Sequence, residues 1–338
     1  MKKFLIFNFS FLIGALLLSA CSPKQKAPER PSFSADSAYA YIEAQMAFGP
    51  RVPNSKAHND CAVWLMRQLR AYGATVELQK GQMPDYRGNM QKIYNIIGHF
   101  NPSNQAEGSN SIKQSPAILL AAHYDTRPWC DEEAEYADRF YNVPGANDGA
   151  SGVGILLEIA RQLSLRDSLL TPVDIVFFDC EDMGTPHFYT GMERSDTWCL
   201  GSQLWATDYA NNAKSQQPIA NSQKYQYGIV LDMVGAPDAV FQRELYSSQY
   251  AANYQQQIWR AAEKLGYSNL FTNQQSYPIT DDHYYINYIA GIPCVDIIHY
   301  DIRNATGFPH WWHTRNDDLT NISKQTLQAV GEVVMAQL

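Results

Sequence analysis

The strongest structural signal in this sequence is Ala117-Ile-Leu-Leu-Ala-Ala-His-Tyr-Asp125, a short and nearly continuous apolar run that ends in polar residues. Such a run predicts a β-strand that is buried on both faces, as strands are in a parallel sheet covered by helices. His123 and Asp125 stand at the carboxyl end of this strand. The run therefore predicts both a central strand and a place where polar side chains emerge from it.

The same pattern recurs downstream. Three further apolar runs are Pro172–Asp179, Gly228–Gly235 and Ile292–His299, and two weaker strands are expected at 74–78 and 93–97. Helical spacing of apolar residues marks 57–73, 153–163, 251–265, 282–290 and 323–337. Buried strands that alternate with helices predict an α/β fold, three-layered, with a mostly parallel central sheet flanked by helices. With no internal repeat, we expect one domain over 33–338.

Polar residues gather where these strands end. His123, Glu181, Asp182 and Asp232 all lie at or near a carboxyl end. In open α/β sheets, ligands bind outside the carboxyl ends of the strands. These four side chains are therefore expected to face a common site.

A carboxylate also stands in the turn Val143-Pro-Gly-Ala-Asn-Asp-Gly-Ala-Ser-Gly-Val-Gly154, whose small residues let the backbone bend sharply around Asp148. The helix expected at 153–163 follows, so Asp148 lies just before the N-terminus of this helix, where a metal ion could reach it. The alternative is an ordinary helix cap. The glycines miss the G-x-G-x-x-G order, which argues against a dinucleotide site.

Histidines and carboxylates without cysteines are the ligand types of a catalytic zinc, which keeps one position open for substrate. Each residue also has an ordinary interpretation: His123 as a core histidine, Glu181-Asp182 as a solvated turn, and Asp281-Asp282 as helix caps. The other histidines are assigned ordinary structural positions. The full candidate set is His123, Asp148, Glu181, Asp182, Asp232, Asp281, Asp282 and His313.

The amino terminus has the layout of an export signal. Lys2 and Lys3 precede an apolar run that ends in Leu18-Ser-Ala-Cys21, and residues 1–20 read as a signal peptide. Cys21 in this setting resembles the lipidation site of bacterial lipoproteins, and the Pro-rich residues 21–32 suit a tether. We expect an exported bacterial lipoprotein, held by its lipid alone at the periplasmic face of a membrane. A cleaved signal with a chance cysteine is the alternative.

Charge and cysteine content narrow the function further. The net charge of -8 and the absence of a basic run argue against nucleic acid as a partner. Beyond Cys21, five cysteines remain, an odd number that leaves at least one free thiol. No Cys-x-x-Cys spacing occurs, so a thiolate zinc site is not expected.

Five motifs, in order, resemble the zinc aminopeptidase superfamily and, within it, the glutaminyl-peptide cyclotransferases of animals and their bacterial relatives. They are Ala122-His-Tyr-Asp125, Gly145-Ala-Asn-Asp148, Phe178-Asp-Cys-Glu-Asp182, Leu231-Asp-Met-Val-Gly235 and Trp312-His-Thr314. The most specific matches to the cyclotransferases are Ile279-Thr-Asp-Asp-His283 and Phe308-Pro-His-Trp-Trp-His-Thr314. The resemblance runs through the chain from about residue 40.

The resemblance implies roles for particular residues. One zinc per chain would be held by Asp148, Asp182 and His313, although animal members carry Glu at the position of Asp182. Glu181 would be the general acid/base. Asp281 and Asp232 would form a carboxylate network around Glu181 and raise its pKa by like-charge repulsion. The pocket walls would be Ile279, Phe308, Trp312 and, opposite them, Trp198.

The implied reaction folds an N-terminal Gln of a peptide or protein onto itself and gives pyroglutamate and ammonia. Nucleophile and electrophile are already tethered, so one Lewis acid and one proton carrier suffice. The first alternative is a two-zinc aminopeptidase, in which His123 and Asp232 would hold the second metal. The second is a lipoprotein that binds peptides without catalysis. A monomer is the default expectation.

Overall fold

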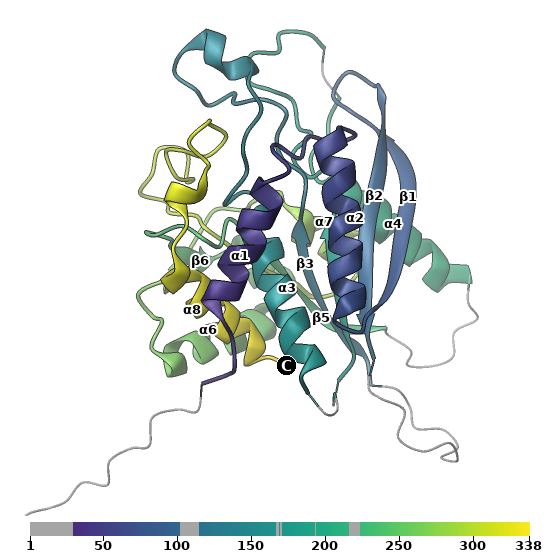
Figure 1. Ribbon diagram of the computed structural model, residues 1–338, viewed down its shortest axis with the longest axis vertical. Coiled ribbons are helices and arrows are strands. Elements are labelled where there is room, and N and C mark those ends of the chain that lie inside the picture. The colour runs from purple at the N-terminus through teal and green to yellow at the C-terminus, as the bar shows by residue number, and fades with distance from the viewer. Residues whose placement is uncertain (1–29, 102–114, 167–168, 170, 193, 216–223) are drawn as a thin grey trace, which may run out of the picture.

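The computed structural model describes residues 30–101, 115–166, 169, 171–192, 194–215 and 224–338. At its centre lies a six-stranded sheet in the order β1-β2-β4-β3-β5-β8 (Figure 1). The strands are β1 (Thr75–Pro84), β2 (Met90–Phe100), β3 (Ala117–His123), β4 (Val173–Phe178), β5 (Tyr225–Asp232) and β8 (Cys294–Ile298). Strands β4, β3, β5 and β8 run parallel, whereas β2 is antiparallel to β1 and β4.

Helices cover both faces of this sheet (Figure 1). One face carries α1 (Ala35–Met46), α2 (Lys56–Ala71), α3 (Ala150–Ser164), α6 (Ala252–Leu265) and α8 (Lys324–Met335). The other carries α4 (Leu200–Ser215) and α7 (Asp282–Tyr288). The expected three-layer α/β fold with a mostly parallel sheet is confirmed.

The alternation of side chains along β3 explains why two layers of helices are needed. Ile118, Leu120 and Ala122 belong to the core cluster under α1, α2 and α3. Leu119 and Ala121 point the other way, into the cluster shared with α4 and α7. Successive strand residues face opposite sides, so a strand that is apolar throughout must be covered twice.

Several elements were not expected from the sequence. They are α1, α4, the short helix α5 (Leu245–Tyr250), the 3-10 helices η1 (Tyr136–Phe140) and η2 (Leu319–Asn321), and a two-stranded sheet of β6 (Phe241–Arg243) and β7 (Phe271–Gln275). Strand β1 extends well past the expected 74–78. These elements are short or half exposed, so they lack the periodic apolar pattern on which sequence interpretation relies.

The expected signal peptide and lipid-modified cysteine cannot be compared with the structure, because they precede the described residues. Residues 1–20 and Cys21 lie outside the described residues, and so does most of the expected tether. Arg30 is described and pairs with Glu332 of α8. No helix among the described residues is long and apolar enough to cross a membrane. Beyond residue 29, the five cysteines, Cys61, Cys130, Cys180, Cys199 and Cys294, are buried free thiols.

Candidate active site

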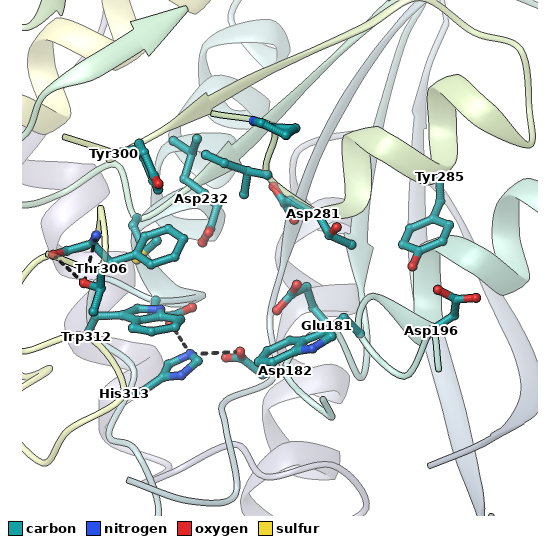
Figure 2. A pocket seen from close by; sticks show the side chains of 18 residues that line it. Glu181, Asp182, Asp196, Asp232, Asp281, Tyr285, Tyr300, Thr306, Trp312 and His313 are labelled. Atoms are coloured by element: carbon teal, nitrogen blue, oxygen red, sulfur yellow. Dashed lines mark hydrogen bonds and ion pairs between the residues drawn. The ribbon is translucent and has the colours of Figure 1, made fainter. Parts of the chain in front are cut away.

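A cavity of about 400 Å³ lies at the carboxyl ends of the parallel strands. Ten of the residues expected to form the site line it. They are Asp148, Glu181, Asp182, Trp198, Asp232, Ile279, Asp281, Phe308, Trp312 and His313. Figure 2 shows the side chains of Glu181, Asp232 and Asp281 around the middle of this cavity, with Asp182 and His313 below them.

Asp148 is placed by a glycine turn and by a carboxylate far along the chain. Gly149 has φ of +94°, and a Cβ on it would lie 2.7 Å from the backbone oxygen of Asp125. Asp317 accepts hydrogen bonds from the backbone N–H groups of Asn147 and Asp148 at 2.8 and 3.0 Å. The turn is thereby fixed, and the Asp148 side chain is only 3% exposed. Glycine at 149 is therefore required by conformation and by space.

Asp125 fixes Glu181 and Asp182 in a similar way. Its two carboxylate oxygens accept the backbone N–H groups of Glu181 at 3.1 Å and of Asp182 at 3.3 Å. The Cys199 thiol donates a hydrogen bond to Glu181 Oε1 at 3.1 Å. The loop after β4 is thus held at both its backbone and the Glu181 side chain.

His313 adopts a left-handed backbone conformation, with φ of 53°. Its ring stacks on Trp312 at 3.7 Å between centroids and lies parallel to the Trp198 ring at 6.1 Å. On its outer side, Nδ1 is 3.7 Å from Asp131, which Arg127 holds in a two-point ion pair. The imidazole is therefore oriented by rings on both faces and by a carboxylate behind it.

Three of these side chains converge with donor atoms suited to a metal. His313 Nε2 lies 3.4 Å from Asp148 Oδ2 and 3.2 Å from Asp182 Oδ1. That nitrogen is buried and makes no hydrogen bond to any described residue. A buried, unpaired imidazole nitrogen facing two carboxylate oxygens fits the three protein ligands of a catalytic zinc. The Asp182 side chain brings Oδ1 within 3.2 Å of His313 Nε2.

His123 stands on the other side of Asp148. Its Nε2 is 3.0 Å from Asp148 Oδ1 and forms a hydrogen bond of 3.2 Å with Asp232 Oδ1. Burial alone would lower the pKa of His123, but Asp125, Asp148 and Asp232 outweigh it and hold that pKa well above its usual range. His123, Asp148 and Asp182 also bring ligand atoms within 4.8 Å of one another. Asp148 is thus shared by two histidines.

Glu181, Asp232 and Asp281 in the cavity have raised pKa values, and the causes of the Glu181 shift differ from those expected. Burial is the largest cause of the strongly raised pKa of Glu181, and the charge of Asp182 comes next. Asp281 contributes less than either. Burial likewise raises the pKa of Asp232 to about 8, against the hydrogen bond from His123. Desolvation, rather than repulsion by Asp281 and Asp232, is therefore the dominant effect on Glu181.

The cavity walls are aromatic and aliphatic. Phe308 stacks on Trp312 with their centroids 4.4 Å apart. Ile279, buried with Met233 and Ile298, continues this wall. On the opposite side, the Arg127 guanidinium lies 4.6 Å from the Trp198 ring centre and braces it. A small planar group would be enclosed between apolar surfaces and the carboxylates.

Comparison with known proteins now identifies the family. Residues 95–338 match the model of peptidase family M28. The chain belongs to peptidase family M28. This match includes every cavity residue named above.

Two solved structures show where this M28 chain stands within the family. Tannerella forsythia glutaminyl cyclase is 45% identical, with a TM-score of 0.80, over 90% of this chain and 98% of the cyclase chain. A Zn-dependent exopeptidase from Parabacteroides distasonis is 41% identical, with a TM-score of 0.81, over 91% of this chain and 99% of that chain. The fold and its length are shared with both.

Curated relatives are more distant. Aminopeptidase YwaD of Bacillus subtilis is 28% identical over 73% of this chain and 44% of its own length. The glutaminyl-peptide cyclotransferase of Boiga irregularis is 24% identical over 64% of this chain and 60% of its own length. The M28 chain thus spans about half the length of the curated relatives it matches.

Some M28 site residues were missed by sequence interpretation. Three residues, Asp317, Asp131 and Arg127, support Asp148, Asp182 and His313. None of the three belongs to a sequence motif that predicts this role. Asp125 was visible, because it follows His123 by two positions at the end of a buried strand. His283, assigned an ordinary structural position, has both ring nitrogens near buried carboxylates.

Proposed function

We propose that this protein is a zinc-dependent glutaminyl-peptide cyclotransferase that converts the N-terminal Gln of peptides or proteins into pyroglutamate and ammonia. The observation that carries this proposal is that the candidate ligands Asp148, Asp182 and His313 and the Glu181–Asp281 pair share one aromatic-walled cavity. Sequence identity of 45% to a glutaminyl cyclase, over nearly the full length of that enzyme, supports the proposal.

In this proposal one zinc is held by Asp148, Asp182 and His313. When bound, the zinc supplies a Lewis acid that polarises the γ-carboxamide of the substrate. The same three residues leave the remaining side of the site open to the cavity. Asp317, Asp125 and Asp131 hold the three ligands in place from behind.

Glu181 carries the proton. Ring closure forms a bond from the α-amine nitrogen to the carbonyl carbon (Cδ) of the side-chain carboxamide and breaks the bond from that carbon to the amide nitrogen. Glu181 takes a proton from the attacking amine and delivers it to the departing nitrogen, which leaves as ammonia. The Cys199 thiol holds Oε1 of Glu181, and Asp281 faces it across the cavity (Figure 2). One carboxylate within reach of both nitrogens therefore completes the proton transfer.

The apolar walls bind and fold the substrate side chain. Ile279, Phe308 and Trp312 form one side and Trp198 the other. A Gln side chain between them is held curled toward its own amine, which raises the effective concentration of the nucleophile. Because the walls exclude water, hydrolysis of the amide is disfavoured.

A two-zinc aminopeptidase is the alternative, and one observation favours it. His123 contacts Asp148 Oδ1, the oxygen other than the one nearest His313, and Asp232 in turn contacts His123, so these two residues with Asp148 could hold a second metal. The similarity to an exopeptidase and to an aminopeptidase points the same way. In that enzyme a metal-bridging water would be required, and peptides would lose their first residue.

The deciding experiment incubates the purified protein with a Gln-Ala dipeptide amide and with Leu-Ala amide, and counts zinc per chain. We expect ammonia and pyroglutamate from the first substrate, no amino acid released from the second, and about one zinc. Release of free leucine with two metals would establish the aminopeptidase. If neither product forms, a protein that binds peptides without catalysis is favoured.

We also propose that the enzyme is a monomeric lipoprotein attached through Cys21 at the periplasmic face of a membrane. The support is the sequence of residues 1–32 alone. Fatty-acid label should enter the wild-type protein and be lost in Cys21→Ser. If the label persists in that variant, the lipid-anchor proposal is wrong, and the cyclotransferase proposal is unaffected.

A further inference from the structure

Behind the cavity wall lies a second buried carboxylate, Glu244, which sits at the N-terminus of α5 and is fully buried. Oε1 accepts hydrogen bonds from the backbone N–H groups of Tyr246 at 2.8 Å and Ile279 at 3.1 Å. Oε2 accepts the N–H and the hydroxyl of Ser247 at 2.6 and 2.8 Å, and pairs with His283 Nε2 at 2.9 Å. Five hydrogen bonds thus fix one carboxylate.

Two of these partners flank Asp281. Ile279 lies two residues before it and carries a cavity wall, and His283 lies two residues after it in the first turn of α7. Glu244 is therefore a single buried group that holds the chain on both sides of Asp281. The far end of α7 is held separately, by the Asn287 side chain, which bonds to the backbone of Cys294 in β8 at 2.8 and 2.9 Å.

The second ring nitrogen of His283, Nδ1, faces two carboxyl groups and makes no hydrogen bond within the described residues. Nδ1 is 3.3 Å from Asp296 Oδ2 and 4.0 Å from Asp281 Oδ2. Both Asp296 oxygens and Asp281 Oδ2 make no hydrogen bond within the described part of the chain. The His283 ring, oriented by Glu244, is thus directed at Asp296 and at Asp281, which lines the cavity.

Glu244 has the electrostatic character that this arrangement requires. Burial alone would raise its pKa, but the hydrogen bonds from His283 and from two backbone N–H groups outweigh burial and lower it. The group is therefore an ionised acceptor in neutral solution. Asp281, by contrast, has a raised pKa because of its burial, which His283 partly opposes.

We infer that Glu244 is a positioning residue for the reaction: through His283 and the backbone of Ile279 it sets the place of Asp281 opposite Glu181 and of the apolar wall beside it. The inference rests on the proposed function, because Asp281 has a role only in that reaction. It assigns to Glu244 two separable effects, one on kcat through Asp281 and one on KM through Ile279.

The first test is Glu244→Gln, assayed as ammonia release from Gln-Ala amide. An amide nitrogen accepts no hydrogen bond, so either the Ser247 and His283 arm or the Tyr246 and Ile279 arm is lost. We expect kcat to fall by roughly tenfold to 10²-fold, as an ångström of misplacement costs in enzymes. Zinc content should stay as in the wild type.

Glu158→Gln is the matched control. Glu158 is equally buried, on α3, and accepts hydrogen bonds from the Ser34 N–H and the side chains of Arg161 and Gln162. Loss of this carboxylate should lower the melting temperature without lowering kcat. If both variants lose kcat in proportion to their melting temperatures, Glu244 acts on stability alone and the inference is overturned.

A double-mutant cycle with Asp281→Asn separates a role through Asp281 from any other. In the Asp281→Asn background, Glu244→Gln should lower kcat by less than about twofold. An equal fold-loss in both backgrounds would show that Glu244 does not act through Asp281. Should Glu244→Gln fail to fold, His283→Gln breaks the same arm and should lower kcat while leaving KM near the wild-type value.

Two further outcomes would also overturn the inference. If the wild-type protein releases no ammonia, the proposed function and the inference are both wrong. If the wild type releases ammonia and Glu244→Gln leaves kcat and KM unchanged, the inference alone is wrong.

Asp281, His283 and Asp296 also bring ligand atoms within 4.8 Å of one another. A second zinc per chain, lost in Asp296→Asn, would therefore make this cluster a metal site.

Discussion

Two histidines flank Asp148, and they differ in how the nitrogen that faces it is engaged. His123 Nε2 forms a hydrogen bond with Asp232, whereas His313 Nε2 faces Asp148 and Asp182 at 3.4 and 3.2 Å without hydrogen-bond geometry to any residue that the structure describes. Both rings are buried to about the same extent, 1% and 2% exposed. Residue type and burial are therefore equal, and only the partners differ.

The difference predicts that the two sides of Asp148 bind a metal unequally. A nitrogen without a hydrogen bond, facing two carboxylates, is ready to bind a cation. A nitrogen engaged by Asp232 must give up that bond before it can ligate. We therefore expect the His313 side of Asp148 to bind zinc and the His123 side to act as an ion pair. Each prediction below tests this asymmetry.

The largest effect is expected for His313→Ala. Removal of a ligand should abolish zinc binding and lower kcat/KM on the order of 10³-fold, because Lewis-acid polarisation contributes several kcal/mol to the transition state. Metal analysis and ammonia release measure the two effects. If the variant retains zinc at the wild-type stoichiometry, His313 is not a ligand, and the expected difference between the two sides of Asp148 is wrong.

Glu181→Gln should separate metal binding from proton transfer. We expect zinc to be retained and kcat to fall by roughly 10²- to 10⁴-fold, the usual contribution of a general acid/base. The same assays apply, and the near-isosteric amide keeps the packing around Cys199. Loss of zinc in this variant would mean that Glu181 itself ligates.

His123→Asn sharpens the comparison directly. Zinc should remain at about one per chain, and kcat/KM should fall by roughly tenfold to 10²-fold, as when an outer partner of a metal ligand is removed. A fall from two metals to one would instead make His123 a ligand. The aminopeptidase alternative would then be preferred.

Phe308→Ala should affect binding more than chemistry. Loss of its stacking on Trp312 should raise KM about fivefold to tenfold, corresponding to about 1 kcal/mol for an aromatic pair. kcat and zinc should change little. Tyr288→Ala, an exposed aromatic outside the cavity, is the control. A KM unchanged by Phe308→Ala would remove Phe308 from the substrate wall.

The smallest effect concerns a histidine–carboxylate pair far from the cavity. His99 of β2 bonds to Asp174 of β4 at 2.8 Å, and this bond raises the pKa of His99 above its usual value. Glu77 also favours the charged form, whereas Lys224 opposes it. Because the folded pKa lies above the unfolded one, the stabilisation is complete below about pH 6.5 and lost as pH rises through the folded pKa.

His99→Gln should therefore lower the free energy of unfolding by about 1 to 2 kcal/mol at about pH 5.5, and by much less at about pH 9. Urea unfolding of both proteins at the two pH values measures this. A deficit that is equal at both pH values would show that the charge of His99 contributes nothing. Enzyme activity should be unchanged.

The sequence predicted the sheet and the cavity residues for a physical reason. Apolar strands and the carboxylates at their ends are local patterns, and chain topology brings the strand ends together. The roles assigned to Asp148, Glu181 and His313 stay predictions until the variants above are measured.

What the sequence did not predict is the support behind those residues. Asp317 fixes the Asp148 turn from 169 positions away, and Glu244 reaches Ile279 and His283 across more than 30. Such contacts are set by tertiary packing, so no local period marks them. Helix α4 was missed for a related reason, because its burial against the sheet, more than its own pattern, stabilises it.

The Arg30–Glu332 pair fixes residue 30, the first that the structure describes, against helix α8. Helix α8 starts at the edge of the sheet where the cavity lies, since the N–H of Ser323, just before it, bonds to the carbonyl of Gly235, just after β5. Glu332 sits more than two turns further along, and Arg30 also bonds to the carbonyl of Leu265 at the end of α6. Residue 30 therefore lies toward the C-terminal half of α8, away from the edge of the sheet where the cavity opens.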